Sequence, residues 1–272
     1  HKCRFEEETG VEITAELTIS KAQDVLATVK NDSVDLILTD PPYNTDLEHW
    51  DKDFDVSWML REFGRILRPG GSAIIFCSDV ILPDYLRYQT PDLFFYELLV
   101  WNKTNPKPTN QAIGNITMKR YLRSTELILW YVKGLKGGAK NKNHDKKFFK
   151  QNVYWKPELI NRELNGNVRT NVFTSAVISK MEKLKDKNGK SLHKTQKPEK
   201  LIESLLLVHS AEGDLVVDPF GGTGTTADVC IKNKRKYLGS EMSPDYVKAI
   251  RDRINTKHQL IDAWAEGIFI SV

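Results

Sequence analysis

The apolar run Val34–Thr39, which ends directly at the tetrapeptide Asp40-Pro41-Pro42-Tyr43, constrains the fold of this chain more than any other feature. A run rich in branched apolar residues is typical of a strand that is buried on both faces, as in parallel sheets. Proline cannot continue the hydrogen-bond ladder, so the strand is predicted to stop there. Because ligands of open α/β sheets bind outside the carboxyl ends of the strands, we expect the tetrapeptide at the place where chemistry is done.

The residue types of the tetrapeptide suit an amino group on a flat heterocycle. An ionised Asp40 only accepts hydrogen bonds, and the fixed φ of Pro41 and Pro42 holds their carbonyls in set directions. The ring of Tyr43 offers a face on which a base can stack. Hydrogen bonds from both amino protons would free the nitrogen lone pair for attack. The simpler alternative is a Pro-Pro turn that only ends a strand, with Tyr43 packed in the core.

A second motif begins near residue 215, where the apolar run Leu215–Val217 leads through Asp218-Pro219-Phe220 into a glycine-rich turn and a predicted helix. Gly222-Thr223-Gly224-Thr225-Thr226-Ala227 matches the nucleotide-binding pattern G-x-G-x-x-G/A, and Glu241 follows near the spacing of an acid on ribose hydroxyls. Glycines let the backbone approach a ligand, and the start of a helix suits a carboxylate or a phosphate. The alternative is a tight strand–helix turn without a ligand.

The position of this motif in the chain decides between kinds of nucleotide-binding protein. No Lys follows Gly224, which excludes a P-loop. A dinucleotide dehydrogenase normally carries the motif on the first strand of a βαβαβ half, but here it begins near residue 215 of 272. The other strands must therefore come from earlier in the chain. We predict an α/β fold with a doubly wound, mostly parallel, Rossmann-like sheet in circularly permuted order.

In this order the two motifs resemble the β-class DNA amino-methyltransferases, in which D-P-P-Y precedes an F-x-G-x-G motif for S-adenosylmethionine. Three further blocks match the patterns W-x-K-x-N-P, T-E-x-x-L-W and H-x-T-Q-K-P. The blocks that carry the resemblance, which spans nearly the whole chain, are Ser33–Ile37, Arg68–Ser72, Trp101–Pro106, Ser124–Trp130 and His193–Pro198.

The resemblance implies a role for each matching residue. Asp40, Pro41 and Tyr43 would hold the extruded target base, and Pro42 would shape the turn. Thr195, Lys197 and Thr225 would lie on the carboxylate of the cofactor, and Glu241 on its ribose. The full set implied for cofactor binding is His193, Thr195, Lys197, Asp218, Phe220, Gly222, Thr223, Gly224, Thr225 and Glu241.

One departure from the family pattern concerns the cofactor's adenine. Relatives carry Gly-Asp about thirteen residues before the Ser-Val-Asp block, and the Asp contacts the adenine. Here those positions read Ser20-Lys21. The adenine contact is therefore expected to be replaced or weakened.

Charge marks out a basic segment. From Val132 to Lys190 the chain has 15 Lys or Arg against 5 Asp or Glu, a net charge of +10, whereas the whole chain carries +4 and the remainder therefore −6. A basic segment with interleaved aromatic residues is typical of phosphate contact, although a solvated lysine-rich loop is the simpler alternative. The resemblance places a small inserted target-recognition region here. The residues expected to contact DNA are Lys136, Lys140, Lys142, Lys146 and Lys147. We divide the chain into a catalytic half (1–131), this insert (132–192) and a cofactor half (193–272).

Other patterns exclude several classes of protein. Cys3, Cys77 and Cys230 form no C-x-x-C pair and none follows a proline, which argues against a zinc site, a disulfide framework and a C5-cytosine methyltransferase. The six His lack metal-ligand spacing, so no metal is expected. No apolar stretch reaches the roughly 18 residues of a membrane span, and no signal peptide is visible. We expect a cytoplasmic protein of a bacterial or phage type, associated with the nucleoid and not with a membrane.

The predicted function is methyl transfer from S-adenosylmethionine to the N6 amino group of adenine in double-stranded DNA, with extrusion of the base. Asp40 at the head of the motif favours adenine, because relatives that act on cytosine N4 more often begin with Ser. N4-cytosine methylation is the near alternative, and a nucleic-acid-binding module with a vestigial cofactor pocket is the alternative from another class. Family likeness suggests a homodimer and a cognate restriction endonuclease as partners.

Overall fold

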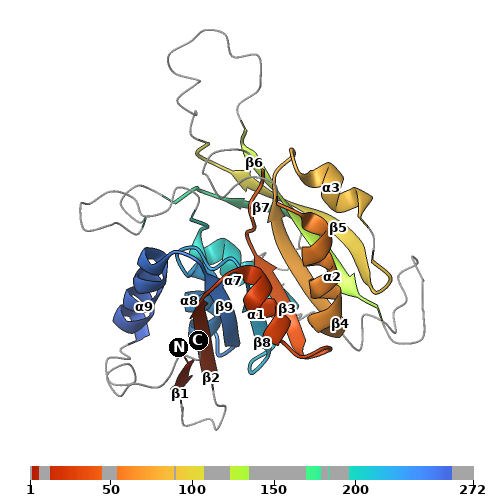
Figure 1. The fold of residues 1–272 in the computed structure, drawn as a ribbon. Coiled ribbons are helices and arrows are strands. Elements are labelled where there is room, and N and C mark those ends of the chain that lie inside the picture. The colour runs from red at the N-terminus through yellow and green to blue at the C-terminus, as the bar shows by residue number, and fades with distance from the viewer. Residues whose placement is uncertain are drawn as a thin grey trace.

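The structure, a computed structural model, describes residues 2–5, 13–44, 54–88, 90–106, 123–134, 170–178, 183 and 196–258. These residues form one mixed sheet of nine strands with helices on both of its faces (Figure 1). The strands are β1 (Lys2–Phe5), β2 (Ile13–Ile19), β3 (Val34–Thr39), β4 (Leu67–Cys77), β5 (Leu93–Lys103), β6 (Thr125–Lys133), β7 (Val172–Ser175), β8 (Leu215–Asp218) and β9 (Lys236–Glu241). The helices are α1 (Ala22–Thr28), α2 (Val56–Ile66), α3 (Leu82–Arg87), α7 (Glu199–His209), α8 (Thr225–Lys232) and α9 (Pro244–His258).

The sheet joins the two ends of the chain. Its order is β1-β2-β9-β8-β3-β4-β6-β5-β7, so β8 and β9 lie between strands from the beginning of the chain. Five of the eight neighbouring pairs among these described strands are parallel. β8 runs parallel to β3 through the pairs Leu36↔Val216 and Ile37↔Val217. The predicted permuted and mostly parallel sheet is confirmed, and the carboxyl ends of β3 and β8 lie at one edge.

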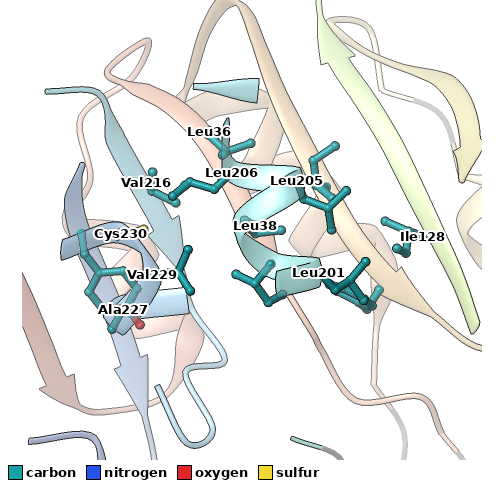
Figure 2. Packing of buried hydrophobic residues seen from close by; sticks show 14 of the residues in the cluster. Leu36, Leu38, Ile128, Leu201, Leu205, Leu206, Val216, Ala227, Val229 and Cys230 are labelled. Carbon is teal, nitrogen blue, oxygen red and sulfur yellow. The ribbon is translucent and has the colours of Figure 1, made fainter. Parts of the chain in front are cut away.

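Alternation along the central strands divides the core into two layers, one on each face. Leu36 and Leu38 of β3 pack into the layer that contains α7, α8 and α9, whereas Ile37 packs into the layer of α1 and α2. All three side chains are fully buried. Figure 2 shows Leu201 and Leu205 of α7 next to Leu38 in the first layer. A strand buried on both faces explains why its sequence is apolar throughout instead of alternating with polar residues.

Helix α7 begins at Glu199, directly after Pro198. Pro198 precedes the helix with φ −65°, and it has no N–H that would need a partner in the first turn. Its apolar residues Leu201, Leu205 and Leu206 face the sheet. Lys197, just before the helix, is thereby brought to the carboxyl edge of the sheet.

None of the helices in the described ranges combines the length and the apolar character needed to cross a bilayer.

Two parts of the predicted insert belong to the sheet. Residues 132–133 end β6, and β7 pairs in parallel with β5 from Val100↔Val172 to Lys103↔Ser175. The indole Nε1 of Trp101 donates to Ser175 Oγ at 2.8 Å, which brings the W-x-K-x-N-P block beside β7. Residues 135–169 lie outside the described residues, and the division of the chain into three parts stays a prediction.

Candidate active site

The carboxyl ends of β3 and β8 border a single cavity. The hydroxyl of Thr39 donates to Asp218 Oδ1 at 2.6 Å and so fastens the two strand ends to each other. The empty space of the cavity, which includes its open mouth, is about 460 Å³. The lining residues are Thr39, Asp40, Phe76, Gln196, Lys197, Ile202, Asp218, Phe220, Gly221, Gly222, Thr223, Thr225 and Thr226. The acidic turn and the glycine turn therefore face one another, as the sequence predicts.

The backbone of the turn after β8 requires glycine. Gly222 and Gly224 have φ of +54° and +73°, in the left-handed region. A Cβ atom on Gly224 would also lie 2.7 Å from Ile250 of α9. Helix α8 begins at the next residue, Thr225, which lines the cavity together with Thr226. The positive end of the α8 dipole thus borders the cavity, and it favours an anionic group there.

Asp218 places a buried carboxylate in the cavity wall. Only 2% of the residue is exposed. Burial raises its pKa to about 6, although hydrogen bonds from the hydroxyls of Thr39 and Thr226 and from the N–H of Phe220 oppose the rise. A buried carboxylate of this kind favours a cationic ligand group, because the cation offsets the lost solvation.

Glu241 ties the glycine turn to the start of α9. Its carboxylate accepts hydrogen bonds from the N–H groups of Gly222 and Ser243, both at 2.9 Å, and burial raises its pKa. Ile19 of β2 pairs with Glu241, so Ser20 follows at the same edge of the sheet. The hydroxyl of Ser20 is buried and has no hydrogen-bond partner among the described residues. Ser20, which stands at the glycine of the family's Gly-Asp pair and precedes Lys21, therefore offers a hydroxyl beside the predicted ribose acid.

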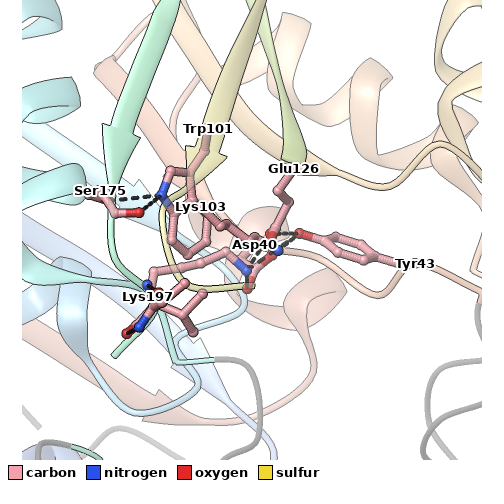
Figure 3. Close-up of polar contacts among 9 residues, drawn as sticks. Asp40, Tyr43, Trp101, Lys103, Glu126, Ser175 and Lys197 are labelled. Atoms are coloured by element: carbon pink, nitrogen blue, oxygen red, sulfur yellow. Dashed lines mark hydrogen bonds and ion pairs between the residues drawn. The ribbon is translucent and has the colours of Figure 1, made fainter. Parts of the chain in front are cut away.

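Asp40 belongs to a cluster of five side chains drawn in Figure 3: Asp40, Tyr43, Lys103, Glu126 and Lys197, here called the Asp40 cluster. The Tyr43 hydroxyl lies 2.5 Å from Asp40 Oδ1 and 2.8 Å from Glu126 Oε1. Lys197 Nζ lies 2.5 Å from Asp40 Oδ2 and 2.8 Å from Glu126 Oε1. Lys103 Nζ lies 2.8 Å from Glu126 Oε2.

The charges of the Asp40 cluster balance, with two carboxylates and two ammonium groups. Burial would raise the pKa of Glu126, but Lys197 and Lys103 outweigh it and lower the pKa to about 2. Burial would lower the pKa of Lys197, but Asp40 and Glu126 raise it. Burial, with the charges of Asp40 and Glu126, raises the pKa of Tyr43 well above its ordinary value. Tyr43 therefore keeps its single proton and donates it to one carboxylate at a time.

Lys197 has partners that the sequence did not predict. The resemblance implies a contact with the carboxylate of the cofactor, whereas the ammonium group pairs with Asp40 and Glu126 and lies 4.9 Å from the ring centroid of Phe76. Its side chain is 6% exposed, so the ammonium group is buried and not solvated at the surface. Lys197 also lines the cavity, and its role toward the cofactor stays a prediction.

Arg253 of α9 supports the glycine turn from the protein side. Its Nη1 donates to the carbonyl of Thr223 at 3.2 Å and to Thr225 Oγ1 at 3.1 Å. Its Nε and Nη2 pair with Asp228 of α8 at 2.9 Å and Glu199 of α7 at 2.6 Å. Arginine has no acceptor, so Thr225 accepts in this contact and its own proton is left for a group in the cavity.

The remaining predicted site residues divide into two groups. Pro41 and Pro42 follow β3, Thr223 lines the cavity, and Phe220 packs against Phe54 edge to face with 5.6 Å between ring centroids. The residues that lie outside the described part of the chain are His193, Thr195, Lys136, Lys140, Lys142, Lys146 and Lys147.

Sequence reasoning gave no role to Thr39, Lys103, Glu126 or Arg253. Glu126 and Lys103 stand inside blocks that were singled out, T-E-x-x-L-W and W-x-K-x-N-P, and a charge at the end of an apolar strand was the available signal. Their meeting depends on the antiparallel pairing of β5 with β6, which includes Trp101↔Glu126. No feature of the sequence indicated a role for Arg253, because it is one of several charged residues in the helix α9.

The cavity lining fits S-adenosylmethionine. The buried carboxylate of Asp218 suits an ammonium group, and the end of α8 with Thr225 suits a carboxylate. Glu241 lies at the next strand end and suits ribose hydroxyls. Gly222, in the left-handed region, lines the cavity without a side chain, so its backbone is open to a ligand.

A permuted, mostly parallel sheet whose acidic turn and glycine turn share one cavity defines the class of amino-methyltransferases with a Rossmann-like fold. The model of the N6/N4 methyltransferase family, described as DNA methylase, matches residues 34–252. The chain belongs to this family.

Relatives and solved structures agree with this assignment. Type II methyltransferase M2.DpnII of Streptococcus pneumoniae is 29% identical over 259 residues, which are 86% of this chain and 87% of the relative. Type II methyltransferase M.HinfI of Haemophilus influenzae is 32% identical over 84% of this chain and 65% of the relative. The crystal structure of an M1.HpyAVI–SAM complex is 25% identical with a TM-score of 0.61, over 89% of this chain and 99% of that chain. The PvuII DNA methyltransferase (cytosine-N4-specific), at 18% identity and a TM-score of 0.66 over 92% and 91% of the two chains, shares the fold. The chain is thus a DNA methyltransferase that uses S-adenosylmethionine.

Proposed function

We propose that this chain methylates the N6 amino group of adenine in double-stranded DNA after the base has left the helix. The observation that carries the proposal is the cavity shared by Asp40 and the glycine turn. A base inside a duplex cannot reach a cavity between strand ends. The base must therefore be extruded, at a cost of about a few kcal/mol.

On the base side, Asp40 and Pro41 hold the two amino protons, and Tyr43 offers its ring to the heterocycle. S-adenosylmethionine, when bound, supplies a methyl group on a positively charged sulfur. The amino nitrogen would take the methyl group as the bond from its carbon to sulfur breaks, would gain positive charge, and would then give up one of its two protons; the carboxylate of Asp40 would stabilise that charge. The protein contributes mainly position and charge, since no covalent step on a side chain is needed.

On the cofactor side, Asp218 holds the ammonium group of the methionine part, and Thr225 with the start of α8 holds its carboxylate. Glu241 holds the ribose, and the hydroxyl of Ser20 replaces the acidic adenine contact of relatives. Support comes from the buried carboxylate of Asp218 and from the buried hydroxyl of Ser20, which has no hydrogen-bond partner among the described residues. His193 and Thr195 are proposed as further contacts by family likeness.

On the DNA side, we propose that the basic segment 132–192 tracks the phosphates through Lys136, Lys140, Lys142, Lys146 and Lys147. Its net charge of +10 on an otherwise acidic chain supports this.

A homodimer and a cognate restriction endonuclease are proposed as partners, because relatives carry the name Type II methyltransferase. The proposed location is the bacterial cytoplasm, at the nucleoid.

The choice of adenine rests on Asp40 at the head of the motif, with N4-cytosine as the second candidate. We expect mass spectrometry of nucleosides from DNA treated with the protein and S-adenosylmethionine to show N6-methyladenine. A gain of N4-methylcytosine without N6-methyladenine would establish the second candidate. Mapping of the methylated positions by sequencing gives the recognition site from the same DNA.

Asp40→Ala tests the catalytic assignment. The variant is expected to lose methyl transfer by at least about a thousandfold, the scale of a removed charge-stabilising group. Its affinity for S-adenosylmethionine, measured by calorimetry, should stay within about threefold, since the acid acts on the base. Turnover close to that of the wild type would remove Asp40 from the reaction.

A further inference from the structure

Asp40 is not free for a substrate amino group in this structure. One oxygen accepts from the Tyr43 hydroxyl at 2.5 Å, and the other pairs with Lys197 Nζ at 2.5 Å. The ammonium group of Lys197 stands where the proposed reaction places an amino group. Asp40 must therefore exchange these donors before it can hold the target base.

The charge on Lys197 makes this exchange important for the rate. The amino nitrogen of the base gains positive charge during methyl transfer, and only an unneutralised Asp40 stabilises that charge fully. An ammonium group at 2.5 Å from Asp40 cancels much of its field and repels the same developing charge. A chain that kept Lys197 on Asp40 throughout the reaction would be a slow enzyme.

Glu126 is an alternative acceptor for both displaced donors. Its Oε1 already lies 2.8 Å from the Tyr43 hydroxyl and 2.8 Å from Lys197 Nζ, so neither donor needs to travel. Tyr43 has a single proton, and a small rotation of the hydroxyl moves it from Asp40 to Glu126. The second oxygen of Glu126 is fixed by Lys103 at 2.8 Å, which holds the carboxylate in place.

We propose that Glu126 is a positioning residue that takes Lys197 and the Tyr43 hydroxyl from Asp40 when the target amino group binds. Glu126 touches neither the base nor the cofactor in this scheme. Its charge keeps the Asp40 cluster neutral while Asp40 itself turns to the substrate. The side chain comes from the start of β6, far along the chain from both motifs, and only the sheet brings it there.

The inference rests on the proposed methyl transfer, and one experiment separates the two. Single-turnover transfer of labelled methyl groups from S-adenosylmethionine to unmethylated bacterial DNA is measured for the wild type and for Glu126→Gln. The glutamine keeps the size and one acceptor but lacks the charge that holds Lys197. The matched control is Glu203→Gln on α7, which removes a carboxylate paired with Lys232 outside the cavity lining.

We expect Glu126→Gln to slow the transfer step by at least about tenfold at saturating DNA and cofactor. Its affinity for S-adenosylmethionine should stay within about threefold, a split that general loss of structure would not produce. Glu203→Gln should transfer at the wild-type rate. If the wild type itself transfers no methyl group, the proposed function and this inference both fall. If the wild type is active and Glu126→Gln equals it, the inference alone is overturned.

In Glu126→Gln, Lys103 would lose its charged partner, and the variant could fold poorly for that reason. A second variant therefore tests the same proposal without leaving Lys103 unpaired. Lys103→Gln/Glu126→Gln removes one charge of each sign and leaves Asp40 and Lys197 as a neutral pair. We expect it to fold, to bind S-adenosylmethionine and to transfer faster than the single variant but slower than the wild type, because Lys197 still holds Asp40. A rate equal to that of the wild type would overturn the proposal.

Discussion

Asp218 illustrates, at the scale of a residue, how a binding site lowers stability. Its carboxylate is buried, and burial raises the pKa from an ordinary value of 3.8 to about 6. Above about pH 6 both the folded and the unfolded chain carry the ionised group, and the folded chain bears the full cost of its burial. As the pH falls below 6, the folded state takes up a proton before the unfolded state does, so this group opposes folding less.

Asp218→Asn is expected to raise the melting temperature of the ligand-free protein at about pH 8, because the amide oxygen still accepts from Thr39 and Phe220 without a charge. The difference from the wild type should shrink as the pH falls through about 6 toward 5. Affinity for S-adenosylmethionine should fall by about tenfold or more at about pH 8, and this loss should shrink below about pH 6, because wild-type Asp218 is then protonated before the cation binds. Thermal melts across this pH range, with calorimetry of the cofactor, measure both. A stability difference that does not change with pH would contradict the assignment.

At the scale of an element, α9 acts on the active site without lining it. Ile250 limits the glycine turn to a residue without a Cβ, and Arg253 holds Thr223, Thr225 and Asp228 from behind. Arg253 is also paired with Glu199 at the start of α7. Three helices and the turn are thus joined by one guanidinium group, whose planar fork of donors suits the task.

Arg253→Lys is expected to keep the charge but to lose the set of simultaneous contacts. Affinity for S-adenosylmethionine should fall by about tenfold, the scale of one hydrogen bond that no longer orients Thr225. The same change in an exposed arginine of α3, Arg87→Lys, disturbs only a surface pair with Asp84 and serves as the control. Calorimetry of the cofactor gives the affinities. Equal affinity for both variants would show that α9 does not orient the turn.

At the scale of the molecule, positive charge is concentrated in one segment of the chain, and most of the sheet comes from the acidic remainder. The remainder has a net charge of −6, whereas the segment 132–190 carries a net charge of +10. The described residues of that segment join the sheet as the end of β6 and as β7, beside the block that contains Trp101. A basic segment anchored at the edge of a sheet can approach phosphates while the cavity stays on the acidic core.

Replacement of Lys140, Lys142, Lys146 and Lys147 by Gln is expected to weaken DNA binding and to flatten its dependence on salt. Each lost phosphate contact should lower the slope of log K against log salt by about 0.9. Fluorescence anisotropy with duplex DNA at several salt concentrations measures the slope. Cofactor affinity is the control and should not change. A slope equal to that of the wild type would show that these lysines do not touch phosphate.

The sequence by itself determined the local chemistry and the order of the parts. An apolar strand that stops at Asp40 and a glycine turn at Gly222–Gly224 are local features, because proline and glycine fix the backbone at their own positions. The late position of the glycine turn required a permuted sheet, which the structure confirms. The sequence also predicted that both turns border one cavity, and the parallel pairing of β3 with β8 brings them there.

Only the tertiary structure decided which side chains meet Asp40. Lys197 belongs to a block predicted for the cofactor, and its pairing with Asp40 depends on where α7 lies against the sheet. Glu126 and Lys103 meet because β5 pairs with β6 in one register, and a shift by one residue would turn them to opposite faces. Long-range strand pairing and the burial that perturbs these charges arise from packing of the whole sheet, which no short stretch of sequence encodes.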